Sequence, residues 1–181
     1  MKLKPIVFYF HGYGSSPTTD KVVRLREAGF LTYAFPIAIE PVSSILSLTL
    51  NIQSVLLEMT DREHEPVCVG TSLGGWYAAK LAGIFQMRSI IINPSIRPNP
   101  SLLKYDVAKA IVERYTPMQF SRNAKYFIGN QDEVFDFTDD KPTLDQYDTT
   151  YVDADHRFNG PEFDLVIDHL NKLNSQEYRK E

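Results

Sequence analysis

Residues 67–85 read VCVGTSLGGWYAAKLAGIF. This run begins with apolar β-formers, turns at Gly70-Thr71-Ser72-Leu73-Gly74, and continues into a segment rich in helix formers. A G-x-S-x-G motif between a strand and a helix is typical of a nucleophile elbow, in which the serine adopts a strained backbone conformation on a tight turn. Glycines two residues to either side prevent crowding at such a turn. We therefore predict that Ser72 is a nucleophile; the alternative is a serine that only caps the helix.

The chain on both sides of this motif alternates short apolar runs with segments of helical period. The expected strands are 6–10, 31–36, 67–70, 89–93, 125–128 and 149–152. The expected helices are 19–28, 42–59, 73–85 and a C-terminal helix with the apolar stripe Phe163, Ile167, Leu170 and Leu173. This alternation is typical of a parallel sheet with helices on both faces. We predict a single α/β domain over residues 1–181, with a mostly parallel sheet of about six strands and a solvated tail at 176–181.

Residues 94–122 interrupt this alternation. They contain four prolines, a helical stretch near 105–114 and no strong strand signal. Prolines end regular elements, and a long connection without strands usually covers the sheet rather than extending it. We expect this segment to be a small lid-like insertion within the single domain.

The composition excludes several classes of protein. The chain has 181 residues, 43% of them hydrophobic, which suits one globular core. A net charge of -4 without a Lys/Arg-rich run gives no electrostatic reason to expect nucleic acid or an anionic membrane as a partner. No apolar stretch approaches the roughly 20 residues of a membrane span, and the apolar run before His11 is too short for a signal peptide. Because the lone Cys68 cannot form an internal disulfide, we expect a cytoplasmic protein.

A serine nucleophile needs a base within hydrogen-bond reach and an acid that orients the base. His156 follows the last expected strand, so it should project from a loop at the carboxyl edge of the sheet, where Ser72 also lies. The other histidines are less suitable: His11 precedes the serine, His64 lies in a charged loop, and His169 falls within the terminal helix. We predict that His156 is the base.

The acid is expected between Ser72 and His156 in chain order. Asp132 follows an expected strand, so its carboxylate should reach the nitrogen of His156 that faces away from the serine. Asp136 is the main rival, and Glu133 is a third option whose longer side chain fits less well. Alternatively, this acidic stretch is a solvated loop or, less plausibly, a calcium site.

Two backbone amides are candidates for an oxyanion hole. The first expected strand ends in His11-Gly12-Tyr13-Gly14, where glycines let the backbone turn so that the Tyr13 N–H faces a reacting oxygen. The Leu73 N–H lies at the start of the elbow helix, where free amides and the helix dipole favour negative charge. Without a serine elbow downstream, the His11–Gly14 pattern would indicate only a turn after a strand. We expect His11 to brace this loop.

Together these motifs resemble the α/β-hydrolase superfamily, and within it the small bacterial YqiA-type esterases. The likeness spans nearly the whole chain and depends on HGYGSSP at 11–17, GTSLGG at 70–75, NPSIRP at 93–98, DEV at 132–134 and DHRF at 155–158. It implies a minimal α/β-hydrolase fold that cleaves carboxylic esters of short acyl chains through a triad of Ser72, Asp132 and His156, without a cofactor or a metal. The segment after Arg97 is shorter than the lid of that group, which leaves the acyl-chain selectivity open.

Two more residues are candidates for substrate contact. Arg97 leaves an expected strand at the catalytic edge and would meet an anionic part of the substrate, but an ion pair that anchors the lid is the favoured interpretation. Trp76 lies on the first turn of the elbow helix, as a pocket wall or a core residue rather than a specific ligand. Rival functions are thioester hydrolysis or acyl transfer by the same triad, and a non-catalytic protein that binds a ligand or partner through this fold.

Overall fold

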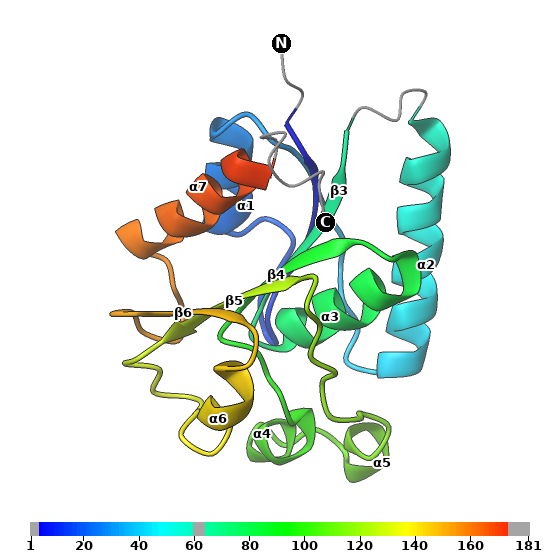
Figure 1. Cartoon of the computed structure of the whole chain (residues 1–181). Helices are drawn as coiled ribbons and strands as arrows, with labels where there is room; N and C mark the ends of the chain where they lie inside the picture. Colours follow the sequence, from blue (N-terminus) through cyan, green and yellow to red (C-terminus); the bar gives the residue numbers. More distant parts are fainter. Residues whose placement is uncertain (1–3, 60–63, 174–181) are drawn as a thin grey trace.

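The computed structural model describes residues 4–59 and 64–173. Within these residues one sheet of six parallel strands has the order β2-β1-β3-β4-β5-β6 (Figure 1). The strands are β1 (Ile6–Phe10), β2 (Leu31–Ala34), β3 (Pro66–Thr71), β4 (Arg88–Ile92), β5 (Ala124–Gly129) and β6 (Asp148–Val152). The predicted α/β class and parallel sheet are confirmed, and the strands differ from the expected ranges only at their ends.

Helices cover both faces of this sheet. On one face lie α1 (Asp20–Glu27) and α7 (Asp164–Leu173), and on the other lie α2 (Pro41–Glu58) and α3 (Leu73–Phe85) (Figure 1). Successive residues of β1 alternate between the two layers because a strand points its side chains to opposite faces in turn. Val7 and Tyr9 pack in the core layer of α1 and α7, whereas Phe8 and Phe10 pack in that of α2 and α3.

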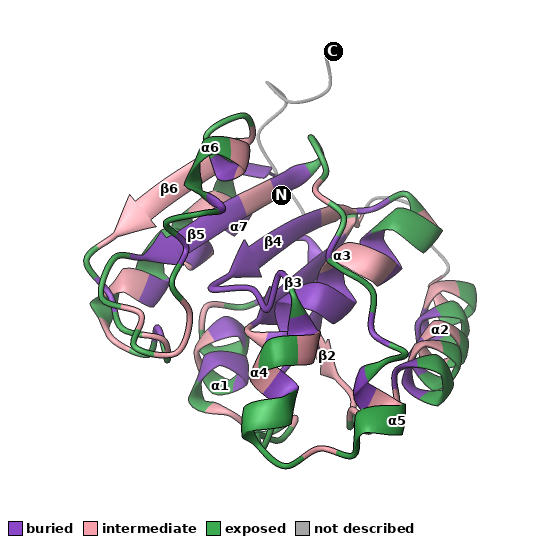
Figure 2. Ribbon diagram, turned by 90° about the horizontal axis from the view of Figure 1, so that it is seen from below, coloured by how far each residue is buried: buried purple, intermediate pink, exposed green. Residues whose placement is uncertain are grey.

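The central strands are buried on both sides, as expected of a parallel sheet between two helical layers. All five residues of β1 are buried, and Figure 2 shows that β3, β4 and β5 are also largely buried. The edge strand β6 is only half-buried over most of its length (Figure 2). This burial explains why the strands read as continuous apolar runs rather than as alternating ones.

The order of the strands brings two loops together. The chain passes from β1 outward to β2 and then returns to β3 on the other side of β1. In open α/β sheets, ligands bind at the carboxyl edge of such a reversal. The loop after β1 carries Tyr13, and the turn after β3 carries Ser72. The topology thus places both residues at the same edge.

The connection between β4 and β5 contains two short helices, α4 (Pro98–Lys104) and α5 (Lys109–Val112). The expected single helix at 105–114 is therefore wrong over its first half. Pro98 and Pro100 were interpreted as breakers, but they lie in the first turn of α4, where a missing N–H costs nothing. Together with α6 (Lys141–Leu144), these helices lie at one end of the sheet (Figure 1). The role of this segment as a lid stays a prediction.

The C-terminal helix is shifted relative to the expected apolar stripe. Phe163 belongs to a 3-10 turn, η1 (Pro161–Phe163), and Ile167 is half-buried, while Val166 is buried beside Leu170. The expected tail at 176–181 lies outside the described residues. In the described part of the chain, no helix has both the length and the apolar character that a membrane span needs. The single domain over 1–181 and the cytoplasmic location stay predictions.

Two leucines of α7 test this packing. Leu170 is completely buried, whereas Leu165 on the same helix is 42% exposed. We expect Leu170→Ala to lower the free energy of unfolding by about 2–5 kcal/mol, because it leaves a cavity in the core. Leu165→Ala should change it by about 0.5 kcal/mol or less. Urea denaturation followed by circular dichroism measures both, and equal losses would contradict the placement of α7.

Candidate active site

Ser72 lies in the turn between β3 and α3 in a backbone conformation that is rare for residues other than glycine. Its φ is 58° and its ψ is -124°. Three backbone hydrogen bonds hold the turn: the Ser72 N–H donates to the Ile92 carbonyl at 3.0 Å, and the Ser72 carbonyl accepts from Gly75 and Ser95 at 2.9 and 3.0 Å. Neighbouring strands therefore stabilise the strained residue.

The glycines of the motif allow a close approach between backbone segments. A Cβ on Gly70 would lie 2.1 Å from the Gly74 carbonyl oxygen, and a Cβ on Gly74 would lie 2.0 Å from the Phe10 carbonyl oxygen. A Cβ on Gly12 would lie 3.2 Å from the Cβ of Ser72. Glycine at these positions lets α3 start directly against the ends of β1 and β3.

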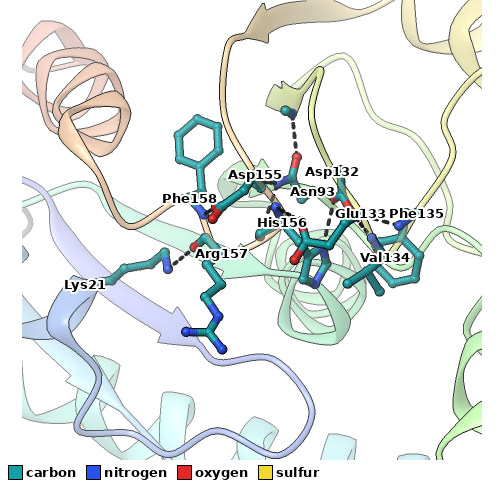
Figure 3. A network of polar contacts seen from close by, with 11 residues as sticks. Lys21, Asn93, Asp132, Glu133, Val134, Phe135, Asp155, His156, Arg157 and Phe158 are labelled. Atoms are coloured by element: carbon teal, nitrogen blue, oxygen red, sulfur yellow. Dashed lines mark hydrogen bonds and ion pairs between the residues drawn. The ribbon is translucent and has the colours of Figure 1, made fainter.

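Asp132 and His156 form a hydrogen-bonded pair (Figure 3). The Nδ1 of His156 lies 2.8 Å from Oδ2 of Asp132, and since an ionised carboxylate only accepts, Nδ1 carries the proton. The other oxygen, Oδ1, accepts from the N–H groups of Val134 and Phe135, each at 2.8 Å. The Asp132 side chain is 2% exposed and that of His156 is 15% exposed. Both carboxylate oxygens are thus occupied, which fixes the orientation of the imidazole.

The two rival acids have other partners. Asp136 is exposed and accepts from the Thr138 N–H at 2.9 Å, and hydrogen bonds from Thr138 hold the pKa of its carboxyl below the usual range. Glu133 accepts from the backbone N–H of His156 at 3.0 Å, and this bond is the main cause of its lowered pKa. Of the three acids, Asp132 is the one that contacts the imidazole. Among the described residues, no cluster of three or more His, Cys, Asp or Glu side chains is arranged to hold a metal.

Asn93 connects three loops at this edge of the sheet. It is completely buried directly after β4, with a φ of 42°, which asparagine tolerates better than most residues. Its Oδ1 accepts from the Gly129 N–H at 2.6 Å, and its Nδ2 donates to the carbonyls of Asp155 and His156 at 2.9 and 3.2 Å (Figure 3). Sequence reasoning missed this role, although a polar residue directly after an Ile-Ile-Ile strand was a signal.

Lys21 on α1 supports the same loop from the opposite side. Its side chain is buried, and its ammonium donates to the Arg157 carbonyl (Figure 3). The ammonium also donates to the side-chain oxygen of Asn159. Burial lowers its pKa to about 8. The loop that carries His156 is therefore anchored to both β4 and α1. Sequence reasoning missed Lys21 because lysines in helices usually face solvent.

Ser72 and His156 line the same cavity of about 660 Å³, a volume in the range of small-molecule sites. The hydrogen bonds found among the described residues do not include one between the Ser72 hydroxyl and His156. Catalytic bonds of this kind often shorten only when a substrate binds. The structure thus brings acid and base into contact and brings the serine to their cavity.

The predicted oxyanion residues line this cavity as well. Leu73 is the first residue of α3, and the Tyr13 ring packs against Tyr105, with 5.4 Å between the ring centres. His11 is buried and its Nδ1 donates to the Gly12 carbonyl at 2.9 Å. Burial lowers the pKa of the His11 imidazole, which favours its neutral form. The expected role of His11 as a brace for the loop stays a prediction.

Neither Arg97 nor Trp76 lines the cavity that contains Ser72. Arg97 forms a two-point ion pair with Asp140, with N–O distances of 2.8 and 2.7 Å, beside a separate cavity of about 170 Å³. Trp76 is 2% exposed, and its indole N–H donates to the Thr116 carbonyl at 2.7 Å. The structure shows an ion pair for Arg97 and a core position for Trp76, as the sequence favoured, rather than substrate contacts in this cavity.

Comparisons with known proteins identify a family and a fold for this chain. A family model described as an uncharacterised protein family, UPF0227, matches residues 6–115. A UPF0227 protein of Shewanella woodyi is 26% identical over 145 residues, which are 72% of this chain and 78% of the relative. The mouse α/β hydrolase domain-containing protein 10 has a TM-score of 0.68 at 15% identity, covering 96% of this chain and 90% of that one. An esterase of Pyrococcus furiosus has a TM-score of 0.67 at 15% identity, covering 94% and 81%.

These findings bear on the resemblance seen in the sequence. The structural neighbours confirm the predicted α/β-hydrolase fold, and at such low identities they show the fold alone. The family match and its relatives confirm the likeness to the small bacterial YqiA-type group.

Two glycines of α3 test the packing of the elbow. At Gly74 an added Cβ would clash with the Phe10 carbonyl oxygen, whereas at Gly83 it would meet nothing within 4 Å. We expect Gly74→Ala to destabilise the protein by about 1–3 kcal/mol. Gly83→Ala should stabilise it by about 0.5–1 kcal/mol, since alanine favours the helix. The two midpoints of urea unfolding measure this difference, and a tolerated Gly74→Ala would show that the close approach is not required.

Proposed function

The chain belongs to the uncharacterised protein family UPF0227, and we propose that it is a serine hydrolase that cleaves carboxylic esters of short acyl chains. One observation carries the proposal: a strained serine at an elbow shares its cavity with a histidine that is hydrogen-bonded to a buried aspartate. This is the arrangement of groups that acyl transfer through a serine requires.

In the proposed mechanism the Ser72 oxygen attacks the ester carbonyl while Nε2 of His156 takes the hydroxyl proton. Asp132 keeps the proton of His156 on Nδ1 and stabilises the imidazolium that forms. The N–H groups of Tyr13 and Leu73 donate to the negatively charged oxygen of the tetrahedral intermediate. The intermediate collapses, the C–O bond to the alcohol breaks, and His156 protonates the departing alcohol. Water, deprotonated by His156, then cleaves the acyl-enzyme and releases the acid.

Burial makes this arrangement effective. With its two oxygens accepting from His156, Val134 and Phe135, the Asp132 carboxylate needs no reorganisation as positive charge develops on the imidazole. The Phe135 ring packs edge-on against the imidazole, with 5.0 Å between ring centres, and excludes water from one side. Electrostatic interactions are stronger in such a partly dry site than in water.

The substrate class follows from the relatives and the cavity. The structural neighbour from Pyrococcus furiosus is named an esterase, and the YqiA-type resemblance implies short acyl chains. A cavity of about 660 Å³ is large enough for a small ester. Each step of the mechanism uses groups of the protein and water, so the proposal invokes no cofactor and no metal.

Replacing the nucleophile is the first test. We expect Ser72→Ala to lower turnover of p-nitrophenyl butyrate by roughly 10⁴-fold or more, because attack through the acyl-enzyme is no longer available. A fluorophosphonate probe should label the folded wild-type protein stoichiometrically at Ser72 and should label neither the variant nor the denatured protein. Unchanged turnover in Ser72→Ala would refute the proposal.

A matched pair of substitutions tests the acid. Asp132→Asn should lower kcat by about 10³- to 10⁴-fold, since the amide no longer stabilises the imidazolium and favours the wrong tautomer. Asp136→Asn removes an equal charge nearby, and we expect kcat to change by no more than about threefold because this residue contacts solvent and Thr138. A larger loss in Asp136→Asn than in Asp132→Asn would assign the acid to Asp136.

A further inference from the structure

The cavity around Ser72 differs in character on the two sides of His156. Val134 and Phe135 lie on one side, and Lys21 and Arg157 lie on the other (Figure 3). All four residues line the cavity, to which α4 adds the apolar side chain of Leu102. An ester that fills this space would therefore place an apolar part and a polar part at different ends.

The fixed charges of the lining are unequal. Lys21 and Arg157 are cationic, and Glu133 is the acidic residue of the lining. One oxygen of Glu133 already accepts from the His156 N–H at 3.0 Å. The chain as a whole has a net charge of -4, so a positive end within this cavity is a local feature that the overall charge does not explain.

Arg157 is the arginine among the described residues that line the cavity. Among the described arginines, Arg24, Arg88, Arg97 and Arg114 form ion pairs with carboxylates. Arg157 takes part in the polar network through its backbone carbonyl, which accepts from Lys21. The residue is exposed and forms no ion pair within the described part of the chain, although its charge acts on Glu133 and helps to lower the pKa of that carboxyl. Lys21 holds the backbone of Arg157 in place, and the Arg157 side chain belongs to the lining of the cavity.

We infer that Arg157 forms a subsite for a carboxylate, so that the substrates of the proposed hydrolase are esters that carry a carboxylate group. A planar guanidinium matches the two oxygens of a carboxylate with two parallel hydrogen bonds. The Arg157 guanidinium carries one positive charge, which suits a singly charged carboxylate better than a doubly charged phosphate. This inference depends on the proposed function for the reaction, but not for the binding of the anion.

Matched esters that differ in one terminal group test the subsite. We would compare p-nitrophenyl hemisuccinate with p-nitrophenyl butyrate for a carboxylate on the acyl side, and 4-acetoxybenzoate with 4-acetoxytoluene for one on the alcohol side. In the wild-type protein, kcat/KM should be about tenfold or more higher for the anionic member of at least one pair. Arg157→Gln should lower that value by about 10- to 100-fold, the range of a hydrogen bond to a charged group, and should lower the value for the neutral member by no more than about threefold.

Two further variants make the result specific. Arg157→Lys should restore part of the preference, since it keeps the charge without the planar fork. Arg122→Gln removes an equal charge from an exposed arginine outside the cavity lining, and it should alter neither substrate of a pair. The subsite is refuted if the wild-type protein hydrolyses both members of each pair with equal kcat/KM, or if Arg157→Gln lowers kcat/KM for both members of a pair equally.

Binding separates the subsite from the reaction. Succinyl-4-nitroanilide and butyryl-4-nitroanilide are amide analogues, and calorimetry with the Ser72→Ala protein measures their affinities without turnover. We expect the succinyl compound to bind more tightly, and Arg157→Gln to remove the difference. If no ester is hydrolysed but this difference is found, the proposed function fails and the subsite stands. If esters are hydrolysed without any charge preference, the proposed function stands and the subsite fails.

Discussion

The close approach of α3 to the carboxyl ends of β1 and β3 is the constraint on which the site depends. Gly70 and Gly74 bring the first turn of α3 within van der Waals distance of the Phe10 carbonyl. The chain must then reverse direction in a single residue, which forces Ser72 to a positive φ. The same approach aims the N-terminus of α3, with its free amides, at the loop that follows β1. Serine, amides and glycine-rich loop are therefore positioned by one packing contact.

Around this contact, polar side chains bind the loops of neighbouring strands to one another. Asn93 joins the loops after β4, β5 and β6, and Lys21 attaches the last of them to α1. Both side chains are buried, so removing either would leave backbone groups without partners, and such groups are costly in a dry interior. The Asp132–His156 pair depends on this support, because the two residues come from different loops. Precision at the site thus comes from residues outside the proposed triad.

The same supports shape the part of the cavity that would meet the substrate. The bond from Lys21 to the Arg157 carbonyl holds the His156 loop, and the Arg157 side chain lines the cavity beside it. Val134 and Phe135 close the other side while they donate to Asp132. Groups that orient the proposed triad therefore also define the charge and polarity of the space next to it. The same triad would cleave esters and thioesters, and comparing kcat/KM for ester and thioester pairs of the same acyl group would show which class the protein prefers.

The sequence by itself determined the fold class, the strands, and the residue types of the proposed triad. Strand and helix periodicities are local, and G-x-S-x-G has meaning wherever a strand precedes it and a helix follows it. The order of the triad residues along the chain limited the candidates for the triad acid to Asp132, Asp136 and Glu133. It also indicated His156, in the loop after the last strand, as the base. These conclusions needed only neighbours along the chain. For the same reason, prolines in the first turn of α4 were interpreted as breakers of structure.

Only the tertiary structure decided which acid contacts His156, and which other residues lie around it. What distinguishes Asp132 from Asp136 is its hydrogen bond of 2.8 Å to the imidazole of His156, which lies 24 residues further along the chain. No local sequence pattern encodes this contact. Arg97 and Trp76 likewise depended on distant partners, Asp140 and Thr116, that withdraw both side chains from the cavity. Lys21 belonged to no motif, and the NPSIRP motif did not reveal the partners of Asn93, because these partners are mostly backbone groups, which every residue possesses. Contacts of this kind arise from the way the strands are ordered in space, and they are therefore visible only once the chain has folded.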